Sequence, residues 1–234
     1  SILLSDAATT LNLSGVISPL QTGYAVYGGL GNDVITGSGA YDLLLSGDGD
    51  DQIFAGIKDD TLLGGTGVDL LSGGNGNDVF QIFEQAEITS GDTLDGGDGF
   101  DTIDIQASQY NYEPIDLTVA TISGIEALIQ ANDFYYGVKL SAAQLNGFDK
   151  LRGFIWVEGT GNVDLAGADL TGVLFKVADS VGTFSLAGSV GDTYSINAGD
   201  AANVIVGGAG FDRVSAAGGN DTVFGGGGQD LLYG

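Results

Sequence analysis

Aspartate recurs at every ninth residue over a long stretch of this chain, and its carboxylate oxygens are suited to binding a hard metal ion. Six consecutive nine-residue units run from Gly28 to Gln81, and each has aspartate at its sixth place. The units read GGLGNDVIT, GSGAYDLLL, SGDGDDQIF, AGIKDDTLL, GGTGVDLLS and GGNGNDVFQ. Their aspartates are Asp33, Asp42, Asp51, Asp60, Asp69 and Asp78. A fixed short period of this kind indicates a repeat architecture.

The same unit returns later in the chain. One full copy, GGDGFDTID, occupies residues 96–104, and three more follow one another over residues 207–233. A weaker copy over residues 198–206 has Asn203 at the sixth place. The later copies add four aspartates at this place: Asp101, Asp212, Asp221 and Asp230. The chain therefore contains two repeat blocks, residues 28–81 and 198–234, with a single copy between them.

Each unit predicts a tight turn followed by a short β-strand. The first six places are rich in glycine, which permits positive φ and close backbone approach. In the last three places the eighth residue is large and apolar and should point inward: Ile35, Leu44, Ile53, Leu62, Leu71 and Phe80 in the first block. Two units would make one coil of about 18 residues, so that alternate units stack about 4.8 Å apart. The predicted fold class is all-β, a parallel β-solenoid with two repeat blocks and a less regular β segment between them.

Stacking of this kind would bring the aspartates of alternate units together. Asp33, Asp51 and Asp69 would share one edge, and Asp42, Asp60 and Asp78 the other. Carboxylates about 5 Å apart repel by a few kcal/mol per pair at an effective dielectric constant of about 20. Only two basic residues, Lys58 and Arg213, lie inside the repeat blocks, so protein cations cannot neutralise this charge. Calcium can, because it accepts several carboxylate and carbonyl oxygens in a flexible geometry, whereas magnesium demands a near-ideal octahedron.

The composition limits the other chemistries open to the chain. It contains no cysteine, methionine or histidine, which excludes disulfide bonds and most zinc or copper sites. The formal net charge is −25, and the 31 acidic residues comprise five glutamates and therefore 26 aspartates. This charge would repel the phosphate backbone, so no nucleic acid partner is expected. No apolar run is long enough to span a bilayer, so membrane insertion is not expected.

The nonapeptide GGxGxDxUx, in which U is a large apolar residue, resembles the RTX or hemolysin-type calcium-binding repeat. This resemblance implies a right-handed parallel β-roll with calcium ions in both rows of turns. It also implies folding on calcium after export, and type I secretion from bacteria. On the same resemblance, the ten sixth-place aspartates are calcium ligands. Turn carbonyls would complete the coordination, such as those of Gly29, Gly31, Gly65, Gly67, Gly74 and Gly76.

Three positions depart from the repeat. Lys58 replaces the fourth-place glycine of AGIKDD, which predicts a weaker site near Asp60. Asn203 gives up a charge in the second block. Asp101 stands in a lone copy, and the nearest candidate for its second carboxylate is Asp92.

We divide the chain into five segments on the basis of these patterns. Residues 1–27 are lead-in strands, residues 28–81 the first calcium-binding β-roll, and residues 82–104 an excursion followed by the single copy. Residues 105–197 keep a strand rhythm without the aspartates, which fits either an irregular solenoid or a small β-sandwich. Residues 198–234 are the second β-roll. A short helix is expected over residues 141–148, with Ser141 as its N-cap.

Candidate catalytic groups are weak in this sequence. A nucleophilic triad has no usual base without histidine, and Glu113, Glu126 and Glu158 are best interpreted as isolated surface or loop acids. Lys139, Lys150 and Arg152 with Tyr135 and Tyr136 could grip an acidic sugar, but ordinary solvated or packing roles are favoured. Trp156 is expected in the core. The chain is therefore predicted not to be an enzyme.

The strand positions that point outward include unexpectedly apolar residues. Leu43, Leu45 and Leu63 should share one face, and a contiguous apolar face is typical of a contact surface. We expect this face to pack against another part of the protein or a neighbouring copy.

Taken together, these features predict a calcium-stabilised structural module of a secreted bacterial surface protein that folds on extracellular calcium. The segments GDTLDGGDGFDTIDI and TISGIEALI are similar to parts of RTX-type surface-layer proteins and large adhesins. The alternative is a non-catalytic repeat module of a secreted enzyme, a polysaccharide-modifying enzyme or a protease. Calcium is the expected cofactor, the expected location is extracellular or at the cell surface, and a cell-surface glycan is a further possible partner.

Overall fold

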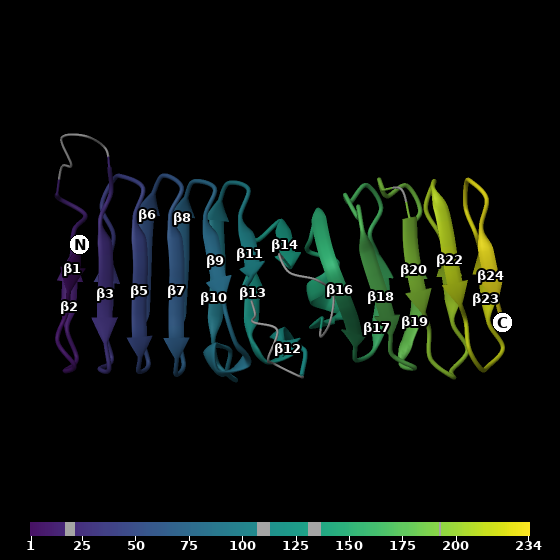
Figure 1. Cartoon of the computed structure of the whole chain (residues 1–234), viewed down its shortest axis with the longest axis horizontal. Coiled ribbons are helices and arrows are strands. Elements are labelled where there is room, and N and C mark those ends of the chain that lie inside the picture. Colours follow the sequence, from purple (N-terminus) through teal and green to yellow (C-terminus); the bar gives the residue numbers. More distant parts are fainter. Residues whose placement is uncertain (17–21, 107–112, 131–136, 192) are drawn as a thin grey trace. The chain divides into compact units, whose positions relative to one another are not determined.

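A computed structural model of the chain describes residues 1–16, 22–106, 113–130, 137–191 and 193–234. The chain divides into two compact units, which we describe separately. Unit 1 consists of Ser1–Ser108 and Val119–Ala127, and unit 2 of Gln109–Thr118 and Leu128–Gly234. Figure 1 shows both as stacks of short strands with almost no helix. The fold is therefore all-β, and its parallel strands form a β-solenoid.

Unit 1 has two parallel sheets whose strands alternate along the chain. The first sheet has the order β1 (Ile2–Leu3), β3 (Ala25–Gly29), β5 (Leu43–Asp48), β7 (Thr61–Thr66), β9 (Val79–Ile82) and β11 (Thr102–Ile105). The second has the order β2 (Thr10–Asn12), β4 (Val34–Thr36), β6 (Gln52–Ile57), β8 (Leu70–Asn75), β10 (Thr93–Asp98) and β13 (Thr121–Ser123). Because successive strands belong to opposite sheets, each pair of units forms one coil, as the repeat predicts. This arrangement fits a right-handed β-roll.

The strand register explains why the ninefold period folds in this way. Leu44 lies beside Leu62, and Ile35 beside Ile53, so strands separated by two units pair at equivalent positions. The eighth-place side chains consequently stack inside the coil, where all six of the first block are 0–6 % exposed. Between β8 and β10, Leu71 pairs with Leu94, because five additional residues form a loop containing the 3₁₀ turn η1 (Gln85–Glu87). The excursion therefore leaves the stacking intact.

Unit 2 is a second, less regular stack of parallel strands. One sheet contains β12 (Ile115–Asp116), β15 (Val138–Ser141), β16 (Lys150–Glu158), β18 (Val173–Val177), β20 (Thr193–Asn197), β22 (Phe211–Ser215) and β24 (Leu231–Tyr233). The other contains β17 (Gly161–Asp164), β19 (Val181–Ser185), β21 (Val204–Val206) and β23 (Thr222–Phe224). The helix α1 (Ala142–Leu145) follows β15, and the Ser141 side chain caps it through a reciprocal capping box with Gln144. The chain passes from one unit to the other near η2 (Leu117–Val119) and again near β14 (Ala127–Gln130).

The part of unit 2 that lacks the aspartate motif still coils, but with a longer repeat. Phe154 pairs with Leu174, which pairs with Ser195, so the coils here are 20 and 21 residues long. Phe175 and Phe184 from opposite sheets meet edge to face in the core, with ring centroids 4.9 Å apart. Every pairing from β15 to β20 is parallel, as in a solenoid, whereas a sandwich has antiparallel sheets. The five segment boundaries drawn from the sequence stay predictions.

The outward face of the first sheet of unit 1 carries the three leucines singled out in the sequence. Leu45 pairs with Leu63, and Leu43 pairs with Thr61 on the same strands. All three leucines are half-buried. The contact that we expect this face to make stays a prediction.

Candidate metal centre

The sixth-place aspartates of unit 1 form two hydrogen-bonded columns, one along each row of turns. In each column the backbone N–H of one aspartate donates to Oδ1 of the aspartate in the next coil, as from Asp33 to Asp51 at 2.7 Å and from Asp60 to Asp78 at 2.7 Å. All members are buried. We call these columns the first ladder, Asp33, Asp51, Asp69 and Asp92, and the second ladder, Asp42, Asp60, Asp78 and Asp101.

Most of these aspartates have one carboxylate oxygen with no hydrogen-bond partner. The oxygen is Oδ2 in unit 1, and it is enclosed by protein. A buried acceptor without a donor is costly, and few occur in a native protein. The unpartnered oxygens in the described residues of unit 1 belong to Asp33, Asp51, Asp60, Asp69, Asp78 and Asp101. Their repetition along the ladders indicates a positively charged ligand rather than a set of unrelated defects.

Backbone carbonyls face the same positions as these free oxygens. A Cβ added to Gly28 would lie 2.6 Å from Asp33 Oδ2 and 2.0 Å from the carbonyl oxygen of Ser46. A Cβ on Gly73 would similarly lie 2.3 Å from Asp78 Oδ2 and 2.7 Å from the Gly96 carbonyl oxygen. At Gly28 and Gly73, the first place of the unit therefore opens onto a small gap in which a carboxylate and a carbonyl of the next coil converge. These first-place carbonyls were not predicted from the sequence, although glycine at that place in four of the six units of the first block was a visible signal.

The carbonyls that the RTX resemblance implies as ligands lie in surroundings that differ from those of the first-place carbonyls. They belong to the second and fourth places. Those of Gly29, Gly31, Gly74 and Gly76 point along the stack toward the glycine of the next coil, whereas the Gly67 carbonyl accepts the Thr89 hydroxyl at 2.6 Å. The Gly29 carbonyl oxygen lies 2.2 Å from where a Cβ on Gly47 would be. Gly65, Gly67, Gly74 and Gly76 all have φ between 97° and 148°, a region that other residues rarely adopt. Their role as ligands stays a proposal.

Burial, more than mutual repulsion, makes the charged form of these carboxylates unfavourable. Burial is the largest cause that raises the pKa of Asp60 to about 8, and the charges of Asp78 and Asp42 raise it further. The pKa of Asp69 is raised to about 7 and that of Asp78 to about 6 for the same main reason. Neighbour repulsion, which the sequence predicts as the main cost, is the smaller cause here. Either cause is relieved by a bound cation.

One predicted ligand of the ladders has no free carboxylate oxygen, and one predicted pairing differs in the structure. Asp42 is in the second ladder, but its Oδ2 accepts the backbone N–H of Ser38 at 2.6 Å, as Asp212 Oδ2 accepts the N–H of Gly208 at the same place of its unit. The predicted pairing of Asp101 with Asp92 is wrong. Asp92 belongs to the first ladder, where its Oδ1 accepts the Asp69 N–H at 2.9 Å, whereas Asp101 accepts the Asp78 N–H at 2.7 Å. Residues 87–95 form a repeat unit with Asp92 at the sixth place, which could have revealed its position.

Unit 2 contains a shorter version of the same arrangement. The Asp212 N–H donates to Asp230 Oδ1 at 3.1 Å, and the Asn203 N–H donates to Asp221 Oδ1 at 2.8 Å. Asp212 has one buried oxygen without a partner, and its pKa is raised to about 6, mainly by burial. Asn203 is also buried and its Oδ1 is unpartnered, while its Nδ2 donates to the Val181 carbonyl. The amide thus takes the place of an aspartate and keeps one free oxygen.

These donors fit calcium. All of them are oxygens, and they combine single carboxylates with backbone carbonyls, as calcium sites do. Nowhere in the described part of the chain do three acidic side chains gather into one cluster, so a site must take its remaining ligands from the backbone or from water. The glycine turns contain carbonyls that we propose for this purpose. The residues present therefore suit calcium better than a metal that prefers nitrogen or sulfur ligands.

Of the described residues considered for sugar binding, two lysines pair with different aspartates. Lys139 Nζ lies 3.7 Å from Asp116, and Lys150 Nζ lies 3.7 Å from Asp169, while Tyr135 and Tyr136 fall outside the described residues.

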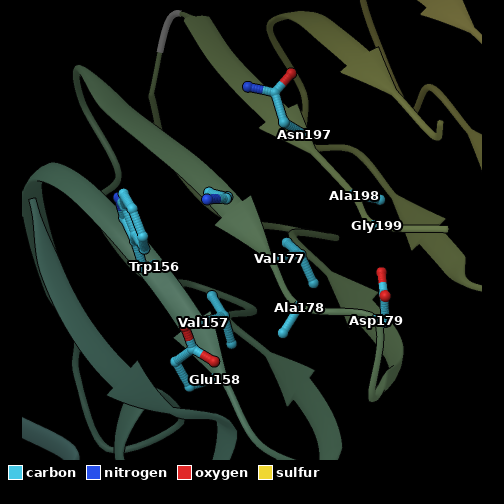
Figure 2. Close-up of a pocket in the computed structure, with 10 residues that line it drawn as sticks. Trp156, Val157, Glu158, Val177, Ala178, Asp179, Asn197, Ala198 and Gly199 are labelled. Atoms are coloured by element: carbon cyan, nitrogen blue, oxygen red, sulfur yellow. The ribbon is translucent and has the colours of Figure 1, made fainter. Parts of the chain in front are cut away.

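Trp156 was expected in the core, but it is half-buried on the outward side of β16. It lines a cavity of about 460 Å³ (Figure 2) with Glu158 and Asn197 among the other lining residues. The Lys176 ammonium lies 3.8 Å from the ring centroid, so it covers one face on which a sugar would stack.

Lys58 gives a testable consequence of the turn geometry. It has φ 81°, where its side chain is strained, whereas the equivalent Gly67 and Gly76 accept positive φ freely. We expect Lys58→Gly to raise the free energy of unfolding in calcium by about 1 kcal/mol, measured by urea titration. Lys58→Ala removes the charge but keeps the strain, so it should give no such gain. Equal stabilisation by both substitutions would mean that the charge, not the backbone, is responsible.

Comparison with protein families identifies four copies of the RTX calcium-binding nonapeptide repeat, in residues 27–62, 55–80, 89–104 and 197–232. A search of curated proteins and a search of solved structures each found no match. The matched segments contain both aspartate ladders of unit 1 up to Asp101, and the paired aspartates of unit 2. The chain thus carries RTX calcium-binding nonapeptide repeats, and these repeats bind calcium ions.

Proposed function

We propose that this chain is a calcium-stabilised structural module of a secreted bacterial surface protein, an adhesin or a surface-layer component. RTX repeats are found in secreted proteins, and a solenoid of such repeats is typically non-catalytic. Among the described residues, no helix is both long and apolar enough to cross a membrane. The observation that carries the proposal is the row of buried carboxylate oxygens that no hydrogen-bond donor reaches.

The proposed calcium ligands are the ten sixth-place aspartates together with carbonyls of the turns. A bound ion neutralises the buried carboxylates and cross-links one coil to the next, because its ligands come from both. The aspartate supplies its free oxygen, and its other oxygen is held in place by the N–H of the neighbouring coil. The carbonyls of Ser46 and Gly96 face the same gaps as the aspartate oxygens. We add these first-place carbonyls to the ligands expected from the sequence.

Calcium binding and folding are coupled in this proposal. The gaps exist only when two coils are stacked, so the ions bind the folded state and stabilise it by mass action. A chain that is exported before it meets calcium would then fold outside the cell. Folding on extracellular calcium suits a structural module at the cell surface, because the ions that complete it are abundant there.

Circular dichroism with and without a calcium chelator tests this function. We expect the β signal and the cooperative melting transition to be lost in chelator and regained when calcium is restored, but not when magnesium replaces it. An unchanged spectrum and melting point in chelator would contradict the proposal. A variant with Asp60→Asn and Asp78→Asn should need more calcium to fold, because it loses two charged ligands of one ladder.

A further inference from the structure

The second ladder does not end at Asp101. The Asp101 N–H donates to Glu126 Oε2 at 2.8 Å, just as the Asp78 N–H donates to Asp101 Oδ1 at 2.7 Å. The Ala127 N–H donates to the Asp101 carbonyl at 2.9 Å, and the Thr102 N–H donates to the Asp78 carbonyl at the same distance. Glu126 therefore occupies the position that aspartate holds in the preceding coils.

The turn that carries Glu126 is shorter than the repeat. Strand β13 pairs with β10 so that Ser123 lies beside Asp95, which places residues 124–126 against residues 96–101. Three residues thus replace the six of a regular turn. Glutamate has one methylene more than aspartate, and this length lets its carboxylate reach the Asp101 N–H from the shortened turn. The substitution of glutamate at this place is therefore matched to the local backbone.

An unsatisfied oxygen faces this turn. Asp101 is fully buried, and its Oδ2 has no hydrogen-bond partner. A Cβ on Gly96 would lie 2.5 Å from Asp101 Oδ2 and 1.9 Å from the Gly124 carbonyl oxygen. The same pairing of a free carboxylate oxygen and a carbonyl of the next coil occurs at Gly73 with Asp78 and Gly96. The gap between the turns is thus continued beyond the last coil that has a full motif.

The neighbouring charges that raise the pKa of Asp101 are all negative. Burial is the main cause that raises the pKa of Asp101, and the charges of Glu126, Asp95 and Asp59 raise it further. The third matched repeat segment ends at residue 104, so nothing in the family match assigns a role to residues 121–129.

We propose that Glu126, Asp101 and the Gly124 carbonyl bind one further calcium ion, which closes the second ladder. This inference rests on the proposed calcium-binding function. The short turn offers fewer carbonyls than a six-residue turn, so water must supply more of the six to eight ligands that calcium takes. The ion should therefore be held more weakly than those inside the repeats.

Calcium binding to the full chain, measured by isothermal titration calorimetry, tests the proposal. Glu126→Gln keeps an acceptor for the Asp101 N–H but loses the charge. We expect it to bind one calcium ion fewer than the unaltered chain, or to bind its weakest ion at least tenfold more weakly. The matched control is Glu84→Gln, which removes an exposed acid of the same unit and should change nothing.

Two outcomes separate this inference from the proposed function. If the unaltered chain binds no calcium, the proposed function fails. If it binds several ions and Glu126→Gln binds as many with the same affinities, only the site at Glu126 is rejected. Should Glu126→Gln lose its β signal in calcium, Glu126→Asp replaces it, since it keeps the charge and shortens the reach. Unchanged stoichiometry and affinity in Glu126→Asp would then overturn the proposal.

Discussion

In calcium-free buffer, the folded protein should become more stable as the pH falls from about 8 to about 4. The buried aspartates of the ladders carry no ion under these conditions and are costly when charged. Burial raises the pKa of Asp60 to about 8, of Asp69 to about 7, and of Asp78 and Asp212 to about 6. Protonation removes the charge and lets each carboxyl group stay inside the turn. Acidification therefore partly replaces calcium.

The direction of this effect follows from the pKa of each group in the folded and unfolded chain. The folded values exceed the ordinary aspartate value of 3.8, so the folded state binds protons more tightly. The stability that these groups contribute is fully present below about pH 4 and is lost as the pH rises through about 6 to about 8. Asp169 has a lowered pKa, mainly because of hydrogen bonds from Thr171, and acts outside this window.

Circular dichroism in chelator at a series of pH values measures the effect, because the β signal that chelation removes near neutral pH should return as the pH falls. Urea unfolding then gives the stability at each pH where a cooperative transition is present. Asp60→Asn mimics the protonated side chain, so it should reduce the loss of stability between about pH 6 and about pH 8. Asp149→Asn, at an exposed position, is the matched control and should leave the pH dependence unchanged. With saturating calcium the dependence should reverse, because the ligands must be deprotonated to bind the ion. Stability in chelator that is flat, or falls on acidification, would contradict the prediction.

The sequence was sufficient to predict the solenoid because the ninefold spacing of the aspartates and the ninefold spacing of the apolar eighth-place residues agree. The ninefold spacing sets the coil, and the apolar eighth place gives each strand one inward side chain. Leu44 beside Leu62 is a direct consequence of that spacing. The two rows of turns then follow, since alternate units must lie on opposite edges. Local pattern and global fold point to the same structure here.

Other parts of the site depend on coils that are not nine residues per unit. Asp92 follows a loop of five additional residues. Glu126 is the last residue of a turn that is three residues shorter than the regular turn. Neither acid therefore lies at a multiple of nine residues from Asp78. A search by period therefore misses Glu126, whereas Asp92 lies nine residues before Asp101 and keeps the period of the unit that follows it. Only the pairing of β10 with β8 and β13 fixes which ladder each acid joins. Long-range register is the information that the sequence pattern lacks.

The position of Trp156 illustrates a second limit of prediction from the sequence. An aromatic residue in an apolar run such as FIWVEG fits either side of a strand. The alternation of β16 decides the side, because Ile155 and Val157 point inward and Trp156 therefore points outward. The nearby Lys176 on β18 then lies over the ring, and a contact across strands separated by 20 residues has no local signal.

Phe80→Ala should destabilise unit 1 by about 3–5 kcal/mol, because it removes a fully buried side chain from the core. Phe80 is 1 % exposed and lies in β9 between Leu62 and Ile103 of the neighbouring strands. Phe83→Ala is the matched control, since Phe83 is 42 % exposed and should lose less than about 1 kcal/mol. The measurement is urea unfolding in saturating calcium. A loss of the same size in both variants would show that burial in the coil is not the cause.

The same variant can report how many ions are coupled to folding. Each ion that binds only the folded state adds about 1.4 kcal/mol of stability for every tenfold rise in free calcium. A loss of about 4 kcal/mol would therefore raise the calcium concentration at the folding midpoint about a thousandfold if one ion is coupled, but only about tenfold if three are. We expect a small shift, because the ladders of unit 1 contain several buried carboxylates with a free oxygen. If Phe80→Ala left the midpoint unchanged while destabilising the core, the ions and the core would not belong to one cooperative transition.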